Sequence, residues 1–120
     1  MKIAIISDVH GNLEALTVVL KYIKENSIDE VYCLGDSVGY GPNPNECIEL
    51  ISKNCKETVI GNHDHAALGL TSTAYFNDFA KMSTYWTSNN LSQESKDFLL
   101  SLEFRYKTDK IGRASCRERV

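Results

Sequence analysis

Ile3-Ala4-Ile5-Ile6-Ser7-Asp8-Val9-His10-Gly11-Asn12 is the stretch that decides the fold, because its apolar run ends in a carboxylate and an imidazole two residues apart. A short apolar run that stops at polar residues predicts a buried β-strand. Side chains two residues apart in an extended segment point to the same side, so we expect Asp8 and His10 to face one point beyond the strand. Carboxylate oxygen and imidazole nitrogen together suit a divalent transition metal.

Two further predicted strands end in the same way. Val31-Tyr32-Cys33-Leu34 is followed by Gly35-Asp36, and Thr58-Val59-Ile60 is followed by Gly61-Asn62-His63-Asp64. Ligands of open α/β sheets bind at the carboxyl ends of the strands, so the three clusters are expected to converge. Each cluster alone has an ordinary interpretation as a turn or cap, but their recurrence after three strands favours a metal site that Mn²⁺, Fe²⁺, Ni²⁺ or Zn²⁺ would fit.

Helices are predicted between these strands. Asn12 is a suitable N-cap for the first helix, and Pro44 suits the first turn of the second, with Asn43 as its cap. The apolar stripes of the two helices are Leu13, Leu16, Val19, Leu20 and Ile23, and Cys47, Ile48 and Ile51. The order strand, helix, strand, helix, strand predicts two βαβ units with parallel strands and right-handed crossovers.

The sequence after Ala66 predicts mainly helix. Aromatic and apolar residues recur every three or four positions, and we expect this stripe to pack in the core. The stripe consists of Tyr75, Phe76, Phe79, Met82, Tyr85 and Trp86. Ser92 is expected to cap a further helix with Phe98, Leu99 and Leu102 facing inward, and Phe104–Lys107 is expected to begin a fourth strand.

The composition indicates one domain without an obvious macromolecular partner. The chain has 120 residues, and a formal net charge of −3 gives no electrostatic reason to expect nucleic acid or an anionic membrane. It has no apolar run near the roughly 20 residues of a membrane-spanning helix and no signal-peptide pattern, so we expect a cytoplasmic location. Four cysteines without a Cys-x-x-Cys pair are expected to be reduced thiols. The sequence does not indicate an oligomeric state.

Residues 111–120 differ in composition from the rest of the chain. They hold three of the four arginines, whereas residues 1–110 contain nine lysines and only Arg105. The segment resembles a translated sequencing-adapter read, and a genuine basic tail is the alternative. We therefore expect residues 1–110 to be a truncated domain and residues 111–120 to be a non-native tail, and the tail is left out of the fold prediction.

The three strand-end motifs resemble those of the calcineurin-like metallophosphoesterases. The matching segments are Asp8-Val9-His10, Gly35-Asp36-Ser37-Val38-Gly39 and Gly61-Asn62-His63-Asp64, in that family's order and spacing. The segment Gly39-Tyr40-Gly41-Pro42-Asn43-Pro44 is similar to the small bacterial and archaeal phosphodiesterase branch. The resemblance implies an α/β fold, namely the N-terminal half of an αββα sandwich, with a βαβαβ unit followed by helices.

The resemblance also implies a two-metal site that hydrolyses small phosphoester molecules, with phosphodiesters as the expected substrates and Mn²⁺ as the expected ion. Two ions about 3.5–4 Å apart can clamp a phosphate and acidify a bridging water. Asp8 and His10 would hold the first ion, Asp36 would bridge both ions, and Asn62 would bind the second. His63 would lie near the scissile phosphate as general acid or charge stabiliser, and Asp64 would orient it. Asn12 and Tyr40 are the candidate substrate-binding residues.

The chain departs from the family in one respect. The second half of these enzymes supplies further metal-binding histidines, ending in a Gly-His-x-His motif, whereas this chain contains only His10, His63 and His65. We therefore expect an incomplete site, an uncovered sheet face and an inactive fragment. The alternative is a non-catalytic metal- or nucleotide-binding module on the same scaffold. The glycines from Gly35 to Gly41 lack the full G-x-G-x-x-G spacing, which argues against a nucleotide loop.

Overall fold

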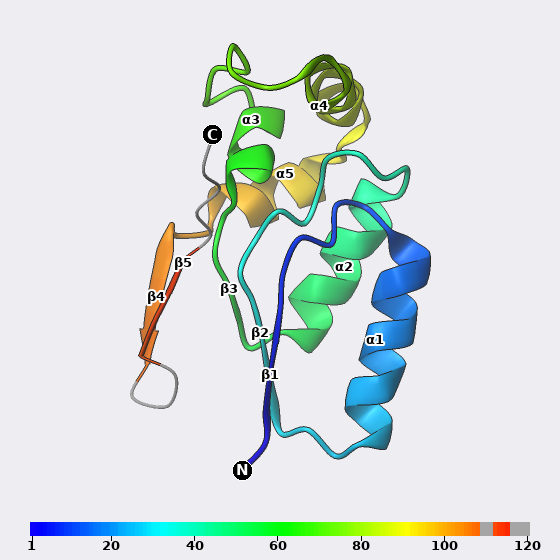
Figure 1. Cartoon of the computed structure of the whole chain (residues 1–120), viewed down its shortest axis with the longest axis vertical. Helices are drawn as coiled ribbons and strands as arrows, with labels where there is room; N and C mark the ends of the chain where they lie inside the picture. Colours follow the sequence, from blue (N-terminus) through cyan, green and yellow to red (C-terminus); the bar gives the residue numbers. More distant parts are fainter. Residues whose placement is uncertain (109–111, 116–120) are drawn as a thin grey trace.

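The fold begins with two βαβ units that form a three-stranded parallel sheet. The computed structural model describes residues 1–108 and 112–115. The strands pair in the order β1-β2-β3, and Figure 1 shows both helices on one face of the sheet. The elements are β1 (Ile3–Ile6), α1 (Leu13–Glu25), β2 (Glu30–Cys33), α2 (Pro44–Asn54) and β3 (Glu57–Thr58). The predicted βαβαβ unit is therefore confirmed.

The two helices begin and bury their faces largely as predicted. The Asn12 side chain caps α1 by accepting a hydrogen bond from the Ala15 N–H at 3.0 Å, and Pro44 occupies the first turn of α2. The three predicted stripe residues of α2 are buried: Cys47 and Ile51 pack with Cys33 of β2, and Ile48 packs toward the later helices. The prediction that Val19 is buried is wrong: it is 39% exposed and lines a hollow beside β1.

Two apolar clusters hold the elements together. The first joins α1, β2 and α2, and the second joins α2 to the later helices. Their buried members are Leu16, Cys33, Cys47 and Ile51 in the first, and Val38, Ile48, Ala67, Leu91 and Leu99 in the second. Burial raises the pKa of the Cys33 thiol to about 11, and the three cysteines in the described ranges are unpaired thiols, as predicted. Each fully buried aliphatic side chain contributes about 1.5–3 kcal/mol.

Three helices follow β3: α3 (Asn62–Ala67), α4 (Asp78–Asn90) and α5 (Gln93–Leu100). Ser92 caps α5 through its hydroxyl oxygen, as predicted, and Asn77 caps α4 through its side-chain amide oxygen. Leu99 is fully buried where α5 packs on α2. None of the helices in the described part of the chain is long and apolar enough to cross a membrane.

The prediction that the aromatic stripe of α4 packs in the core is wrong. Phe79 is 80% exposed, and the residues that α4 buries are Ala80, Thr84 and Thr87. These small residues also recur at helical spacing, and they allow α4 to approach its neighbours closely. Exposed members of the stripe are Tyr75, Phe79, Met82, Tyr85 and Trp86.

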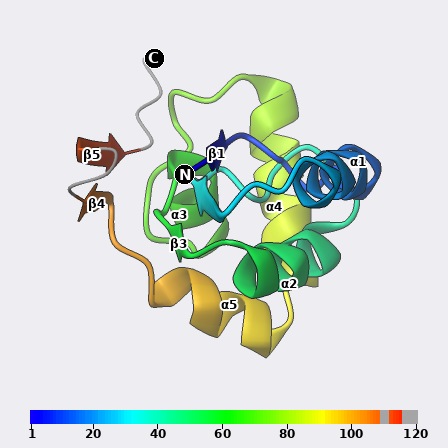
Figure 2. The same cartoon turned by 90° about the horizontal axis from the view of Figure 1, so that it is seen from below.

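A short hairpin lies on the other side of the sheet from α1 and α2 (Figure 2). Its antiparallel strands are β4 (Arg105–Thr108) and β5 (Gly112–Ser115), which confirms the strand predicted near residue 104. The Tyr106 ring lies 5.8 Å from that of Tyr32, which is 2% exposed, whereas Ile5 on β1 is 53% exposed. The sheet face predicted to be uncovered is therefore covered at β2 and open at β1. The predicted domain boundary after residue 110 lies outside the described residues.

The exposed stripe gives a direct stability test. We expect Phe79→Ala to change the free energy of unfolding by less than about 0.5 kcal/mol, because its side chain is mostly in solvent. The matched core variant, Leu99→Ala, should cost about 2–5 kcal/mol. Urea denaturation followed by circular dichroism measures both. A loss of 2 kcal/mol or more in Phe79→Ala would show that this helix face is packed.

Candidate metal centre

The loops that follow β1 and β2 stay joined beyond the ends of the strands. The Asp8 N–H donates to the Gly35 carbonyl at 3.0 Å, and the His10 N–H donates to the Asp36 carbonyl at 2.9 Å. The Gly11 N–H continues the series by donating to the Ser37 carbonyl at 2.8 Å. This backbone pairing brings the first two predicted motifs together at the carboxyl end of the sheet.

Four of the predicted site residues adopt left-handed backbone conformations. The φ angles are 59° at Asp8, 48° at His10, 52° at Asp36 and 64° at Tyr40. Such conformations cost about 1–2 kcal/mol per residue, and they concentrate at functional sites. Asp8 and His10 therefore meet through turns, and our expectation that an extended strand would carry them is wrong, because β1 ends at Ile6.

The His10 ring is fixed by its contact with the neighbouring loop. Its Nδ1 lies 2.9 Å from the Val38 carbonyl oxygen. A carbonyl oxygen only accepts, so Nδ1 carries the proton and the Nε2 lone pair is available to a ligand. Nε2 lies 3.5 Å from Asp8 Oδ1, while the other oxygen of Asp8 accepts a hydrogen bond from the Ser7 hydroxyl. Asp8 and His10 thus present an oxygen and a nitrogen to the same point.

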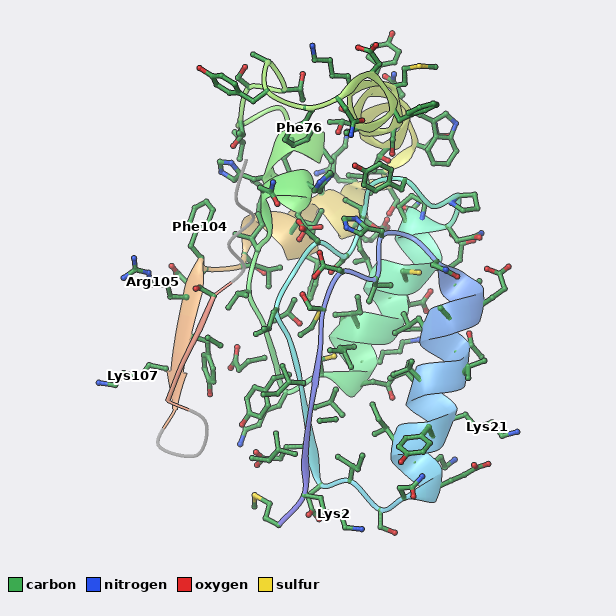
Figure 3. The ribbon with its side chains drawn as sticks, viewed as in Figure 1. Lys2, Lys21, Phe76, Phe104, Arg105 and Lys107 are labelled. Atoms are coloured by element: carbon green, nitrogen blue, oxygen red, sulfur yellow. The ribbon has the colours of Figure 1, made fainter. Side chains whose placement is uncertain are left out.

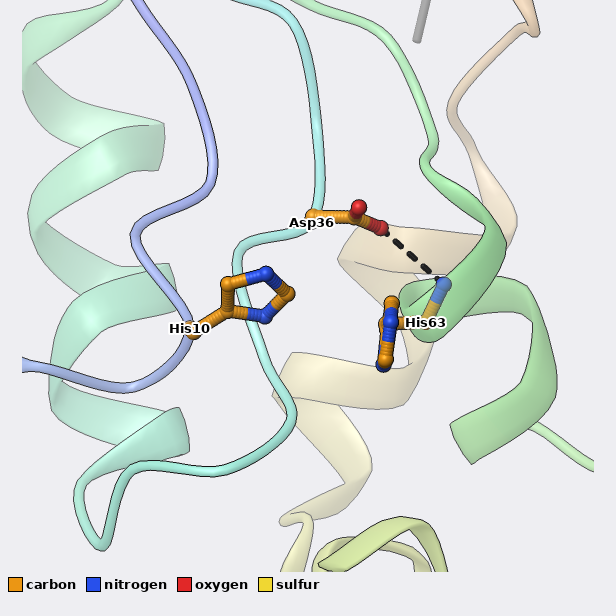
Figure 4. Close-up of side chains that lie close together, drawn as sticks. All are labelled: His10, Asp36 and His63. Carbon is orange, nitrogen blue, oxygen red and sulfur yellow. Dashed lines mark hydrogen bonds between the residues drawn. The ribbon is translucent and has the colours of Figure 1, made fainter. Parts of the chain in front are cut away.

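Asp36 is the buried carboxylate at the centre of the site. Its Oδ1 accepts the His63 backbone N–H at 3.0 Å (Figure 4). Its Oδ2 is buried and has no hydrogen-bond partner within residues 1–108 and 112–115. Ligand atoms of His10, Asp36 and His63 lie within 4.8 Å of one another. Burial raises the pKa of the Asp36 carboxyl group. A cation would supply the partner that this buried oxygen lacks, so the residues fit a metal ion.

Asp64 holds the loops of the second and third motifs together. It is fully buried, and its two oxygens accept backbone N–H groups from Gly61, Asp36, Ser37 and Val38 at 2.9–3.1 Å. Burial raises the pKa of its carboxyl group to about 7, although the Gly61 N–H acts in the opposite direction. The sequence motif did not indicate this clamping role, which depends on two loops far apart in the chain.

Gly61 and Asn62 bring the third motif against Asp36. Gly61 precedes α3, and a Cβ atom at this position would lie 2.1 Å from Asp36 Oδ1. Asn62 and His63 are the first residues of α3, the side-chain oxygen of Asn62 is buried, and the His63 side chain is almost fully buried. The absence of a side chain at Gly61 therefore allows the start of α3 to contact the carboxylate.

The two candidate substrate-binding residues lie in different settings. The Tyr40 ring centroid is 5.1 Å from that of His10 and 5.3 Å from that of His63, so Tyr40 borders the site. Asn12 uses its side-chain oxygen to cap α1, and it lines a hollow beside β1 together with Asp8. Phe76 is a site neighbour that the sequence did not reveal, because it belonged to the stripe assigned to the core. Its ring centroid lies 4.8 Å from that of His63.

Comparison with known proteins agrees with this geometry. A sequence model of the calcineurin-like phosphoesterases matches residues 1–115. The chain belongs to this family. In its crystal structure, a metallophosphoesterase from Sphaerobacter thermophilus superimposes with a TM-score of 0.75 at 45% identity, over 90% of this chain and 44% of that chain. The fold of this calcineurin-like phosphoesterase is therefore shared with solved members of the family.

Two curated relatives are also similar. An uncharacterized protein of Methanocaldococcus jannaschii is 52% identical over 101 residues, covering 83% of this chain and 41% of the relative. A symmetrical bis(5'-nucleosyl)-tetraphosphatase of Actinobacillus pleuropneumoniae is 36% identical over 63 residues, covering 50% of this chain and 23% of the relative. The chain thus spans less than half the length of the curated relatives it matches.

Gly61 offers a test of the close contact with Asp36. Its φ of −94° suits alanine, so Gly61→Ala should act through the clash of the new Cβ with the carboxylate and the backbone nitrogen of Asp36. We expect at least about tenfold weaker Mn²⁺ binding in calorimetric titration, because displacing a ligand's support typically costs 10–100-fold. In the control Gly69→Ala, φ is +77° with no atom within 4 Å, so about 1–2 kcal/mol of stability should be lost without a change in Mn²⁺ affinity. Equal Mn²⁺ affinities in the two variants would contradict the proposed contact.

Proposed function

We propose that the protein to which this chain belongs hydrolyses phosphodiesters of small molecules at a two-metal site, and that this chain supplies part of that site. The observation that carries the proposal is the buried Asp36 carboxylate. One of its oxygens lacks a hydrogen-bond partner among the described residues, and the carboxylate groups with His10 and His63. Similarity to a symmetrical bis(5'-nucleosyl)-tetraphosphatase supports a small substrate with phosphate linkages. The cytoplasmic location expected from the sequence stays a prediction.

The proposed ligand set follows the three strand ends. Asp8 and His10 would hold the first ion, and Asp36 would bind both ions. Asn62 would be the other ligand that this chain provides for the second ion. Mn²⁺ is the proposed metal, with Fe²⁺, Ni²⁺ and Zn²⁺ as alternatives that suit the same donors. When bound, such ions supply positive charge that polarises a phosphate and lowers the pKa of water.

His63 and Asp64 have separate proposed roles. The imidazole of His63, at the start of α3, would face the substrate phosphate and either donate a proton to the leaving oxygen or stabilise negative charge on the phosphate. Asp64 would act as a positioning residue, because its oxygens accept four backbone N–H groups from the two loops. The proton-transfer step therefore rests on His63.

We further propose that residues 1–110 are the N-terminal part of a larger domain and that residues 111–120 are non-native. The chain spans 41% of its Methanocaldococcus jannaschii relative and 44% of its structural neighbour. Completion of the metal site would then depend on ligands from the remaining part. On this proposal the chain binds a divalent ion weakly and hydrolyses phosphodiesters little or not at all.

Asp36→Asn tests the central ligand. The amide keeps the shape of the side chain but loses the negative charge and one acceptor oxygen. Titration calorimetry should show Mn²⁺ binding to the chain weakened at least about 100-fold, more than the loss of an outer-shell partner causes. The control Asp97→Asn removes an exposed carboxylate from α5 and should leave the Mn²⁺ affinity unchanged. Equal Mn²⁺ binding in both variants would argue against the metal centre.

His63→Gln separates a catalytic role from a ligand role. If His63 acts on the substrate, its loss should leave Mn²⁺ affinity within about threefold. Hydrolysis of bis-p-nitrophenyl phosphate should fall about 10²- to 10⁴-fold in a version that continues past residue 110 with its natural sequence. A large loss of Mn²⁺ affinity would make His63 a ligand. If the longer version hydrolyses bis-p-nitrophenyl phosphate no faster than its Asp36→Asn variant does, the result supports the non-catalytic module.

A further inference from the structure

The rings of Tyr40, His63 and Phe76 lie together at the edge of the metal centre. The Phe76 and His63 rings are 4.8 Å apart with an interplanar angle of 31°, and those of Tyr40 and His63 are 5.3 Å apart with an angle of 44°. Figure 3 labels Phe76 beside α3, in the segment that leads to α4. Tyr40 and Phe76 come from separate loops, so the fold gathers them on one imidazole.

Tyr40 is held there in a way that core packing does not explain. Its φ of 64° is unfavourable for a bulky residue, yet its side chain is 50% exposed. Its backbone N–H donates to the Ser83 hydroxyl of α4, which ties the loop to that helix. Gly39 precedes it, and a Cβ there would lie 3.1 Å from His63 Nδ1. The loop therefore presses against His63 while leaving half of the tyrosine in solvent.

We propose that Tyr40 and Phe76 form an aromatic wall that binds the flat ring of a phosphate ester, such as the base of a nucleotide. This inference rests on the proposed function, because the phosphate of the same ligand would lie at the metal centre. The ring centroid of Tyr40 is about 5 Å from those of His10 and His63. An organic group that extends from the phosphate toward this side would therefore contact the wall. Stacking of one base on an aromatic side chain strengthens binding by about five- to 150-fold.

The test compares ligands that differ only by the ring. Adenosine 5'-monophosphate, ribose 5-phosphate and inorganic phosphate are titrated calorimetrically into the full chain in the presence of Mn²⁺. We expect adenosine 5'-monophosphate to bind at least about tenfold tighter than ribose 5-phosphate. Tyr40→Leu and Phe76→Leu should each reduce this ratio at least about threefold. Tyr75→Leu replaces a ring that is 83% exposed, and the ratio should stay unchanged.

The outcomes separate the wall from the phosphoesterase site. Equal affinity for the two sugar phosphates, with Mn²⁺-dependent phosphate binding retained, overturns the wall and leaves the proposed function standing. Failure of all three ligands to bind at a Mn²⁺ concentration that saturates the chain, or binding that survives EDTA, overturns both. Tyr40→Phe keeps the ring and should keep the ratio, which shows that the ring and not the hydroxyl group contributes. Retained Mn²⁺-dependent phosphate binding by Tyr40→Leu excludes a folding defect in that variant. The wild-type ratio is itself decisive if a leucine variant does not fold.

Discussion

The carboxylate of Asp64 is the constraint on which the site depends. It accepts backbone N–H groups from the loop after β2 and from the turn after β3, and it is completely buried. Hydrogen bonds to a charged acceptor are about twice as strong as neutral ones, and each buried N–H left without a partner costs about 1–3 kcal/mol. The carboxylate therefore fixes the distance between the second and third motifs before any ligand is present.

Backbone hydrogen bonds, including one to Asp64, offset the strain of the left-handed residues in the site. Asp8, His10 and Asp36 all have positive φ angles, and only surrounding structure can hold three such residues in neighbouring turns. The backbone bonds between the first two loops hold Asp8 and His10, while Asp64 binds the N–H of Asp36 itself. The donor atoms are thus preorganised by backbone interactions, and their side chains remain available for a ligand.

The sequence predicted what depends on local pattern and missed what depends on tertiary contacts. The strands, the capping of α1 by Asn12 and of α5 by Ser92, and the order of the motifs follow from local patterns over a few residues, whereas the predicted cap Asn43 makes no capping hydrogen bond through its side chain. The left-handed turns at Asp8 and His10, and the clamp by Asp64, arise from loops separated by more than 25 residues. Helical periodicity in α4 also left two candidate faces, Phe79 with its aromatic neighbours and Ala80 with Thr84 and Thr87. Period alone does not decide which face other elements cover.

His63 lies at the boundary between two chemical environments. On one side its backbone N–H holds Asp36, and its ring faces that of His10 at 4.9 Å. On the other side its ring meets the rings of Tyr40 and Phe76. A phosphate ester has a charged end and an organic end. His63 contacts protein groups suited to each of them. The position of α3, set by Gly61 against Asp36 and by Asp64 against the β2 loop, therefore orders the polar and the aromatic parts of the site together.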